Sequence, residues 1–167
     1  MGGDPMQSNQ QQLFLKRLEE KLQRLGLKTV VEPGGGAPQI GDTLRTLLPT
    51  GEGEAVLMEF TLTSYDERSD LLHFYTTILM HMEGEGAPLR SALLEWNILC
   101  PLGAFGIFLE GGQFYHKYTL PVPQDILPET LAEQAMYLAD LIMDVITDRY
   151  PEIVRLGGGA NAPGTSQ

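Results

Sequence analysis

The chain has 167 residues, 43% of them hydrophobic, a size that suits one globular domain with a substantial core. Its formal net charge is −11, and the acidity is uneven: residues 1–50 carry six Lys/Arg against five Asp/Glu, whereas residues 51–167 carry five against seventeen. Such a surface repels a phosphate backbone, so we expect no nucleic-acid partner and favour a basic or neutral protein partner. Cys100 is the only cysteine, which excludes an intramolecular disulfide and a cysteine-based zinc cluster.

The N-terminal residues show no charged-then-apolar leader, and no apolar run approaches about eighteen residues. We therefore expect a cytoplasmic protein that does not bind a membrane. The segment "MGGDP" is typical of an expression remnant, with Met6 as the native start. We expect a flexible N-terminus over residues 1–7, a single α+β domain over 8–155, and a disordered, glycine-rich tail over 156–167.

The first half of the chain predicts one helix and several strands. Ser8 and Gln11 have the spacing of a capping box, and an apolar stripe at helical spacing follows before Gly26: Phe14, Leu15, Leu18, Leu22 and Leu25. Residues 27–32 and 43–49 favour short extended segments, separated by a Gly/Pro-rich loop over 33–42 that lacks the Lys and Ser/Thr of a phosphate-binding loop.

Two longer strands come next. Apolar residues alternate with others in the first of them, residues 54–65, the period of a strand with one buried face: Val56, Met58, Phe60 and Leu62. A turn over 66–70 leads to residues 71–82, whose aromatic and β-branched residues favour a second strand. Pro88 then opens a helix to Cys100 whose wide apolar sector indicates cover on more than one side.

Residues 103–121, "GAFGIFLEGGQFYHKYTLP", predict a β-hairpin. With Gly111 and Gly112 as a two-residue turn, Leu109 lies opposite Phe114, Ile107 opposite His116 and Phe105 opposite Tyr118. One face of the hairpin then carries apolar side chains, with His116 pointing inward: Phe105, Ile107, Leu109, Phe114, His116 and Tyr118. Gly106 leaves the other face of the hairpin without a side chain at that position, so a helix or a second subunit can approach closely there.

The last element is an amphipathic helix over 128–153. Its predicted buried stripe consists of Leu131, Ala135, Leu138, Ile142, Val145 and Ile146. An acidic face, Asp140, Asp144 and Asp148, repeats every fourth residue, a spacing that costs an isolated helix roughly 0.2–0.5 kcal/mol per like-charged pair. A solvated face that maintains solubility is the favoured interpretation, with a partner-binding surface as the alternative.

No residue pattern predicts catalysis, a cofactor or a metal site. His73 and His81 lie on one strand face but about 26 Å apart, too far to share an ion. His116 is interpreted as a packed core or interface histidine, and Cys100, at a helix C-terminus in apolar company, as an unreactive packing residue. We therefore expect no catalytic, cofactor-binding or metal-ligating residue.

The predicted order is α-β-β-β-α-β-β-α, with three or four strands before the middle helix and an antiparallel sheet packed by helices in an α+β fold. This order, the helix "LRSALLEWN", the hairpin "LGAFGIFLEGGQFYHKYTLPV" and the acidic C-terminal helix resemble the type III secretion chaperone-like fold. The similarity is to its YbjN-like branch and a branch of uncharacterised cyanobacterial proteins, and it covers roughly residues 8–155. It implies a small acidic homodimer without catalysis that binds other polypeptides, with a dimer contact at Leu89, Leu93, Trp96 and Phe108.

These observations lead to a first hypothesis of a non-enzymatic protein-binding module, chaperone-like or regulatory. A small-molecule-binding or enzymatic domain with a pocket near His116, Tyr115 and Tyr118 is the alternative from another class. A stress or transcription regulator that acts through protein contacts is a third, which sequence cannot separate from the first.

Overall fold

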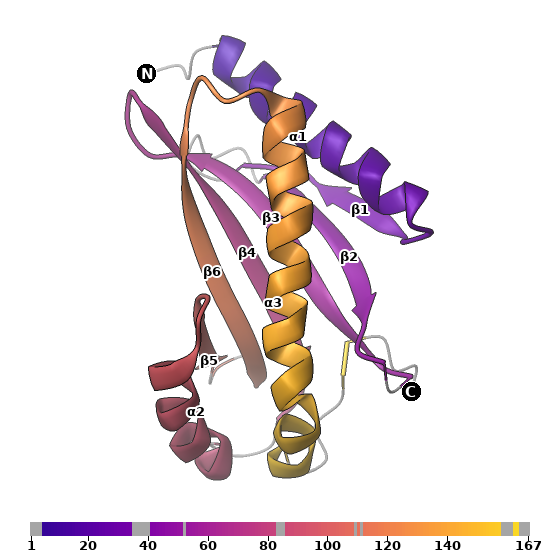
Figure 1. The fold of residues 1–167 in the computed structure, drawn as a ribbon, viewed down its shortest axis with the longest axis vertical. Helices are drawn as coiled ribbons and strands as arrows, with labels where there is room; N and C mark the ends of the chain where they lie inside the picture. The colour runs from indigo at the N-terminus through magenta and orange to yellow at the C-terminus, as the bar shows by residue number, and fades with distance from the viewer. Residues whose placement is uncertain are drawn as a thin grey trace. The chain divides into compact units, whose positions relative to one another are not determined.

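The computed structural model describes residues 5–34, 41–51, 53–82, 86–108, 110, 112–157 and 162–163. Within these residues the chain forms three helices and six strands, labelled in Figure 1. In chain order they are α1 (Pro5–Arg24), β1 (Thr29–Glu32), β2 (Thr43–Pro49), β3 (Ala55–Ser64), β4 (Ser69–Leu79), α2 (Ala87–Leu99), β5 (Ala104–Phe108), β6 (Gln113–Pro123) and α3 (Pro128–Leu156).

The strands form one six-stranded sheet in the order β1-β2-β3-β4-β6-β5, and the outer pairs β1–β2 and β5–β6 are antiparallel. The predicted α+β class with an antiparallel sheet is confirmed. The predicted element order listed three strands before α2 and left a fourth open, and the structure has four. The segment over residues 27–32, expected to be extended, contains strand β1, which has only four residues, three of them exposed.

Two compact units make up the chain. Unit 1 comprises Met1–Thr46, Glu59–Phe74 and Thr119–Ala139, and unit 2 comprises Leu47–Met58, Tyr75–Tyr118 and Asp140–Gln167. Strands β2, β3, β4 and β6 and helix α3 each contribute residues to both units.

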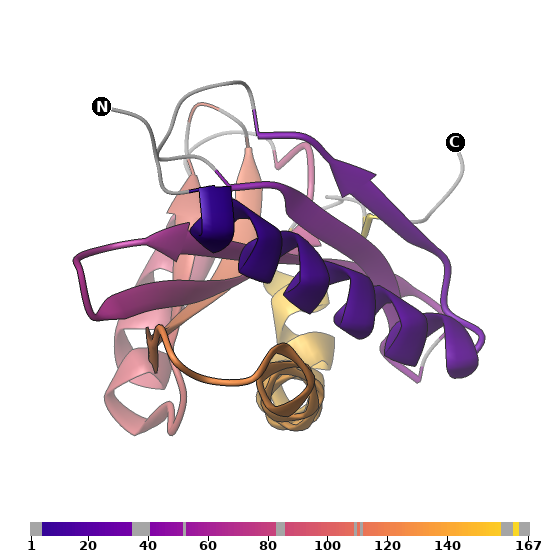
Figure 2. The same ribbon diagram turned by 90° about the horizontal axis from the view of Figure 1, so that it is seen from above.

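In unit 1, helix α1 buries the predicted apolar stripe as far as Leu22. Leu25 was expected to continue the stripe but is exposed, because the helix ends at Arg24. Figure 2 shows α1 crossing beside the first turns of α3, where Lys21 Nζ lies 2.5 Å from Glu129 Oε1. The hydrogen bond from Lys21 holds the pKa of Glu129 below its ordinary value.

The long strands carry the predicted alternation. All four residues of the predicted inward face of β3 are buried: Val56, Met58, Phe60 and Leu62. In unit 1, His73 on β4 lies between neighbouring strands, with Nε2 3.0 Å from Thr63 Oγ1 on β3 and Nδ1 3.1 Å from Thr119 Oγ1 on β6. His73 therefore links three strands through side-chain hydrogen bonds.

In unit 2, the register of the β5–β6 hairpin differs from the predicted one by two residues. Phe105 pairs with His116 and Phe108 with Gln113, so four residues rather than two connect the strands. Gly112 adopts a φ of +58°, and its carbonyl accepts a hydrogen bond of 2.9 Å from the Met82 N–H. This anchor lies thirty residues earlier in the chain, so the hairpin sequence alone does not reveal it. Because the shift is even, the described residues of both strands keep their predicted faces, and Phe105, Phe114 and His116 are buried.

Gly106 has a different role from the one expected. A Cβ atom at this position would lie 2.5 Å from Cζ of Tyr115, the residue paired with Gly106 across the hairpin. The Tyr115 ring therefore covers the glycine, and it stacks on Tyr75 with a centroid distance of 4.8 Å. Within the chain, a cross-strand aromatic ring rather than a helix makes the close approach.

Several predicted features fall on residues outside the described ones. These are most of the N-terminal segment 1–7, the centre of the loop over 33–42, Leu109 and Gly111 of the hairpin, and most of the tail over 156–167. The C-terminal helix, predicted over 128–153, continues to Leu156.

Candidate functional site

Helix α2 and strand β5 are joined in unit 2 by one asparagine side chain. Asn97 Nδ2 donates to the Phe105 carbonyl at 2.9 Å, and Asn97 Oδ1 accepts from the Phe105 N–H at 2.7 Å. The Asn97 amide thus supplies the two hydrogen bonds that a neighbouring strand would give to β5, which lies at the edge of the sheet. This pairing fixes the helix against the hairpin.

The inward side of α2 packs into an aromatic cluster. The Trp96 ring meets Phe105 edge-on at 5.9 Å and Phe114 at 6.4 Å, measured between ring centroids. Phe105 in turn stacks on Phe114 at 5.8 Å and meets the His116 ring edge-on at 5.2 Å. Edge-to-face pairs of this kind add about 0.5–1.5 kcal/mol each beyond the area they bury. The cluster therefore packs α2 against the hairpin.

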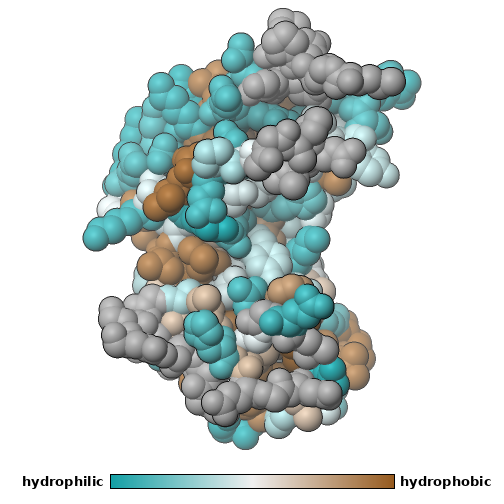
Figure 3. Space-filling view, turned by 180° about the vertical axis from the view of Figure 1, so that it is seen from behind, coloured by the Kyte–Doolittle hydropathy of each residue, from teal (hydrophilic) through white to brown (hydrophobic). Residues whose placement is uncertain are grey.

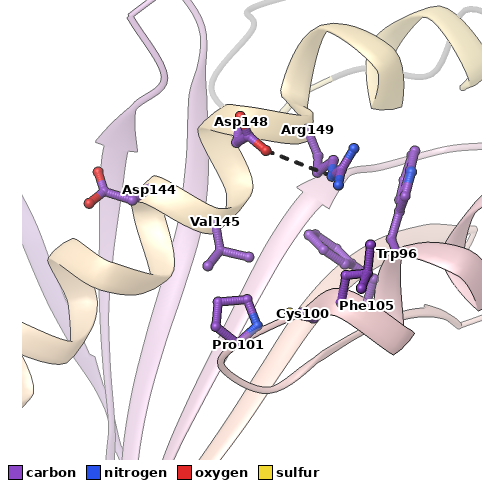
Figure 4. A pocket seen from close by; sticks show the side chains of 9 residues that line it. Trp96, Cys100, Pro101, Phe105, Asp144, Val145, Asp148 and Arg149 are labelled. Carbon is purple, nitrogen blue, oxygen red and sulfur yellow. Dashed lines mark ion pairs between the residues drawn. The ribbon is translucent and has the colours of Figure 1, made fainter.

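A hollow of about 250 Å³ opens beside this cluster (Figure 4). Its walls combine apolar residues of α2, β5 and their connection with one residue of α3: Trp96, Leu99, Cys100, Pro101, Phe105 and Val145. Three charged residues of α3 complete the lining: Asp144, Asp148 and Arg149. An apolar chamber with charged groups from one side is the usual form of a binding site.

One cation already belongs to this hollow. The Arg149 guanidinium carbon lies 5.9 Å from the centroid of the Trp96 ring, and Arg149 Nε lies 3.8 Å from Asp148 Oδ2. Figure 4 shows Arg149 between Asp148 and Trp96, with Asp144 on the preceding turn of α3. In the described residues, no ion pair involves Asp144, which is exposed. The Asp144 carboxylate points away from Trp96 and Arg149 in Figure 4, so the hollow carries the Asp148–Arg149 pair, with Asp144 at its edge.

His116 lies behind the hollow and is fully buried. Its Nε2 is 2.7 Å from the Leu102 carbonyl, and because a carbonyl oxygen only accepts, Nε2 carries the proton. Nδ1 is buried without a hydrogen-bond partner. Burial lowers the pKa of His116, and the hydrogen bond to Leu102 offsets this only in part. The ring is therefore held neutral.

Cys100 is half-buried at the end of α2, where it lines the hollow. Its Sγ donates to the Leu102 carbonyl at 3.1 Å and lies 4.0 Å from His116 Nε2. Both groups therefore direct their hydrogen atoms at the same carbonyl oxygen. This arrangement gives the Cys100 thiol no base, since Nε2 is already protonated.

The four residues expected at a dimer contact do not lie on one surface. Leu89 and Trp96 are buried within the chain, Leu93 is half-buried, and Phe108 is exposed. The exposed apolar residues of α2 are instead Leu94, Ile98 and Leu99. At 100° per residue Leu94 and Ile98 fall among the polar residues Arg90, Ser91 and Glu95, outside the wide apolar sector. The signal that could have found them is this mixture of large apolar and charged residues on one helix face.

The other predicted site residues have these positions. The predicted acidic face Asp140, Asp144 and Asp148 is exposed on α3, and two of its members line the hollow. The pocket expected near His116, Tyr115 and Tyr118 is not assembled, because Tyr115 lies on the opposite face of β6 from the other two.

No metal centre is found in the part of the chain that the structure describes, where no three His, Cys, Asp or Glu residues are grouped to hold an ion. Across the same residues, none of the helices is both long and apolar enough to span a bilayer. A scan against models of protein families and a search of curated proteins both returned no match. The similarity to the type III secretion chaperone-like fold therefore remains a prediction from the sequence.

Proposed function

We propose that this protein is a non-enzymatic, chaperone-like or regulatory module that works as a homodimer in the cytoplasm and binds a polypeptide partner. One observation carries the proposal: Leu94, Ile98 and Leu99 of α2 are 67%, 80% and 77% exposed. Figure 3 shows the molecule from behind, so α2, at the lower left of Figure 1, lies at the lower right there. Hydrophobic surface is visible at this edge. Clustered exposed apolar residues of this kind mark contact surfaces.

The exposed residues of α2 face two directions. Leu94 and Ile98 are one helical turn apart on the side opposite the buried Leu89 and Trp96. A second copy related by a two-fold axis presents the same pair, so the two helices can pack against each other through identical residues. Leu99 belongs instead to the wall of the hollow. We assign the outward pair to the homodimer and the hollow to the polypeptide partner.

Light scattering after size exclusion tests the dimer. We expect twice the chain mass of 18.4 kDa for the natural chain and a single chain mass for Ile98→Asp. Thr147→Asp on α3 is the matched control, because it adds the same charge at an exposed helical position and should leave the dimer intact. A natural chain that remains monomeric at high concentration, or an equal loss of mass in both variants, contradicts the assignment.

The hollow beside Cys100 and Phe105 favours a small-molecule site as the second candidate function. A metabolite panel followed by thermal melting tests it, with Cys100→Ala to change the wall and Tyr137→Phe as an exposed control that does not line the hollow. Ligand-induced melting shifts that Cys100→Ala removes and Tyr137→Phe retains would support the small-molecule site. The absence of such shifts favours the polypeptide partner.

A further inference from the structure

We propose that the hollow of unit 2 receives the side chain of an arginine or lysine from the polypeptide partner, with large apolar residues on either side of it in the partner sequence. The inference rests on the proposed function, since it names the chemistry of the segment that the module binds.

The walls and size of the hollow suit one long cationic side chain. Trp96 and Phe105 supply aromatic surface, and Trp is the side chain that attracts a cation most strongly over its ring face. The volume of about 250 Å³ is below the range of about 300–1,000 Å³ typical of sites for drug-sized ligands. Exposed Leu99 at the edge offers apolar contact to the residues that flank the cation.

The charges around the hollow complement a basic segment. Asp144 and Asp148 line it, and Asp144 has no ion pair within the described residues. Unit 2 as a whole contains ten Asp/Glu against four Lys/Arg in its sequence. A basic peptide is therefore attracted to this unit over a distance, and Asp144, whose carboxylate points outward at the edge of the hollow, is available to pair with the arriving cation.

Arg149 shows that the hollow accommodates a guanidinium. Its position 5.9 Å from the Trp96 centroid and 3.8 Å from Asp148 is the contact set that an incoming arginine would use. Arg149 therefore competes with the partner's cation for the indole face and the carboxylate. Its removal is expected to strengthen binding, whereas a site built for an acidic peptide would lose affinity.

Trp96 is the only tryptophan of the chain, so its fluorescence reports directly on the hollow. The probe is an acetylated, amidated peptide of sequence Leu-Leu-Arg-Leu-Leu, titrated at low and high salt. The matched peptide has citrulline in place of arginine, which keeps the shape and removes the charge. We expect about tenfold weaker binding of the citrulline peptide, the combined loss of one cation–π contact and one ion pair.

Three variants locate the effect. Asp144→Asn should weaken binding of the arginine peptide about three- to tenfold, and Arg149→Gln should strengthen its binding at least about twofold. Asp140→Asn is the matched control, since Asp140 is exposed on the same helix one turn earlier and does not line the hollow. It should change binding by less than about twofold after screening by salt.

The outcomes separate the two proposals. Equal binding of the arginine and citrulline peptides, or equal effects of Asp144→Asn and Asp140→Asn, overturns the basic preference while peptide binding itself supports the module. Weaker binding in Arg149→Gln, together with tighter binding of a Leu-Leu-Glu-Leu-Leu peptide, overturns it in favour of an acidic partner. No fluorescence change with any peptide overturns the inference, and a monomeric natural chain in the same preparation overturns the proposed function as well.

Discussion

Acidification should destabilise this protein through one buried side chain, His116. The ring is fully buried, its Nε2 donates to the Leu102 carbonyl, and its Nδ1 has no hydrogen-bond partner. Protonation would place an N–H at Nδ1 with no acceptor and a charge among aromatic rings. Cys100 is the titratable group found beside the ring among the described residues, with its Sγ 4.0 Å from Nε2. It lies on the Nε2 side and therefore supplies no acceptor for a proton on Nδ1.

The direction and size of the effect follow from proton linkage. Burial lowers the pKa of His116 in the folded chain below the ordinary value of 6.5. The stability that the neutral ring provides is therefore complete above about pH 6.5, declines as the pH falls below it, and is lost once the pH has fallen through the lowered folded-state pKa. Within that window each pH unit removes up to about 1.4 kcal/mol of the free energy of unfolding at 25 °C.

Urea unfolding at a series of pH values measures this loss, which corresponds to a midpoint shift of about 0.5–1.4 M per pH unit for a urea slope of about 1–3 kcal/mol/M. His116→Gln keeps an amide donor for the Leu102 carbonyl and cannot titrate. We therefore expect this variant to be less stable than the natural chain, with a free energy of unfolding that depends less on pH. His81→Gln is the control, because His81 is exposed, and it should follow the natural chain. Parallel pH profiles for the natural chain and His116→Gln would refute the reasoning.

Two further predictions concern packing in unit 2. Gly106→Ala should lower the free energy of unfolding by about 1–3 kcal/mol in urea and weaken the near-ultraviolet tyrosine signal, because a Cβ displaces the Tyr115 ring from Tyr75. Ala104→Ser is the control, since Ala104 is exposed on the same strand face, and it should change the stability little. Equal losses of stability in the two variants would contradict the ring contact. Tyr150→Phe should cost about 1.5–3 kcal/mol in thermal unfolding, because the buried Tyr150 hydroxyl donates to the Glu54 carboxylate, whereas Tyr137→Phe on the exposed face of α3 should be neutral.

Local periodicity was sufficient to predict the class of the fold and the inward faces of its long elements. The alternation of Val56, Met58, Phe60 and Leu62 requires only that one strand face be buried, and the structure buries all four. The hairpin register was wrong by two residues, because it depends on the bond between Gly112 and Met82, a contact distant in sequence. The faces were still right, since an even shift leaves each side chain on its own side.

The candidate site was less predictable because its residues come from segments far apart in the chain. Trp96 and Phe105 were predicted to be apolar contact residues or core, and Asp144 to be part of a solvated face. Only tertiary packing brings them around one hollow, with Asn97 holding α2 to β5 and α3 supplying the charges. An acidic helix face and a wide apolar sector, each explained separately as solubility and packing, together form a chamber whose aromatic walls and carboxylates suit a cation. The acidity of the later part of the chain has two explanations, solubility and the proposed recognition of a basic segment at this hollow, and the comparison of Asp144→Asn with Asp140→Asn distinguishes them.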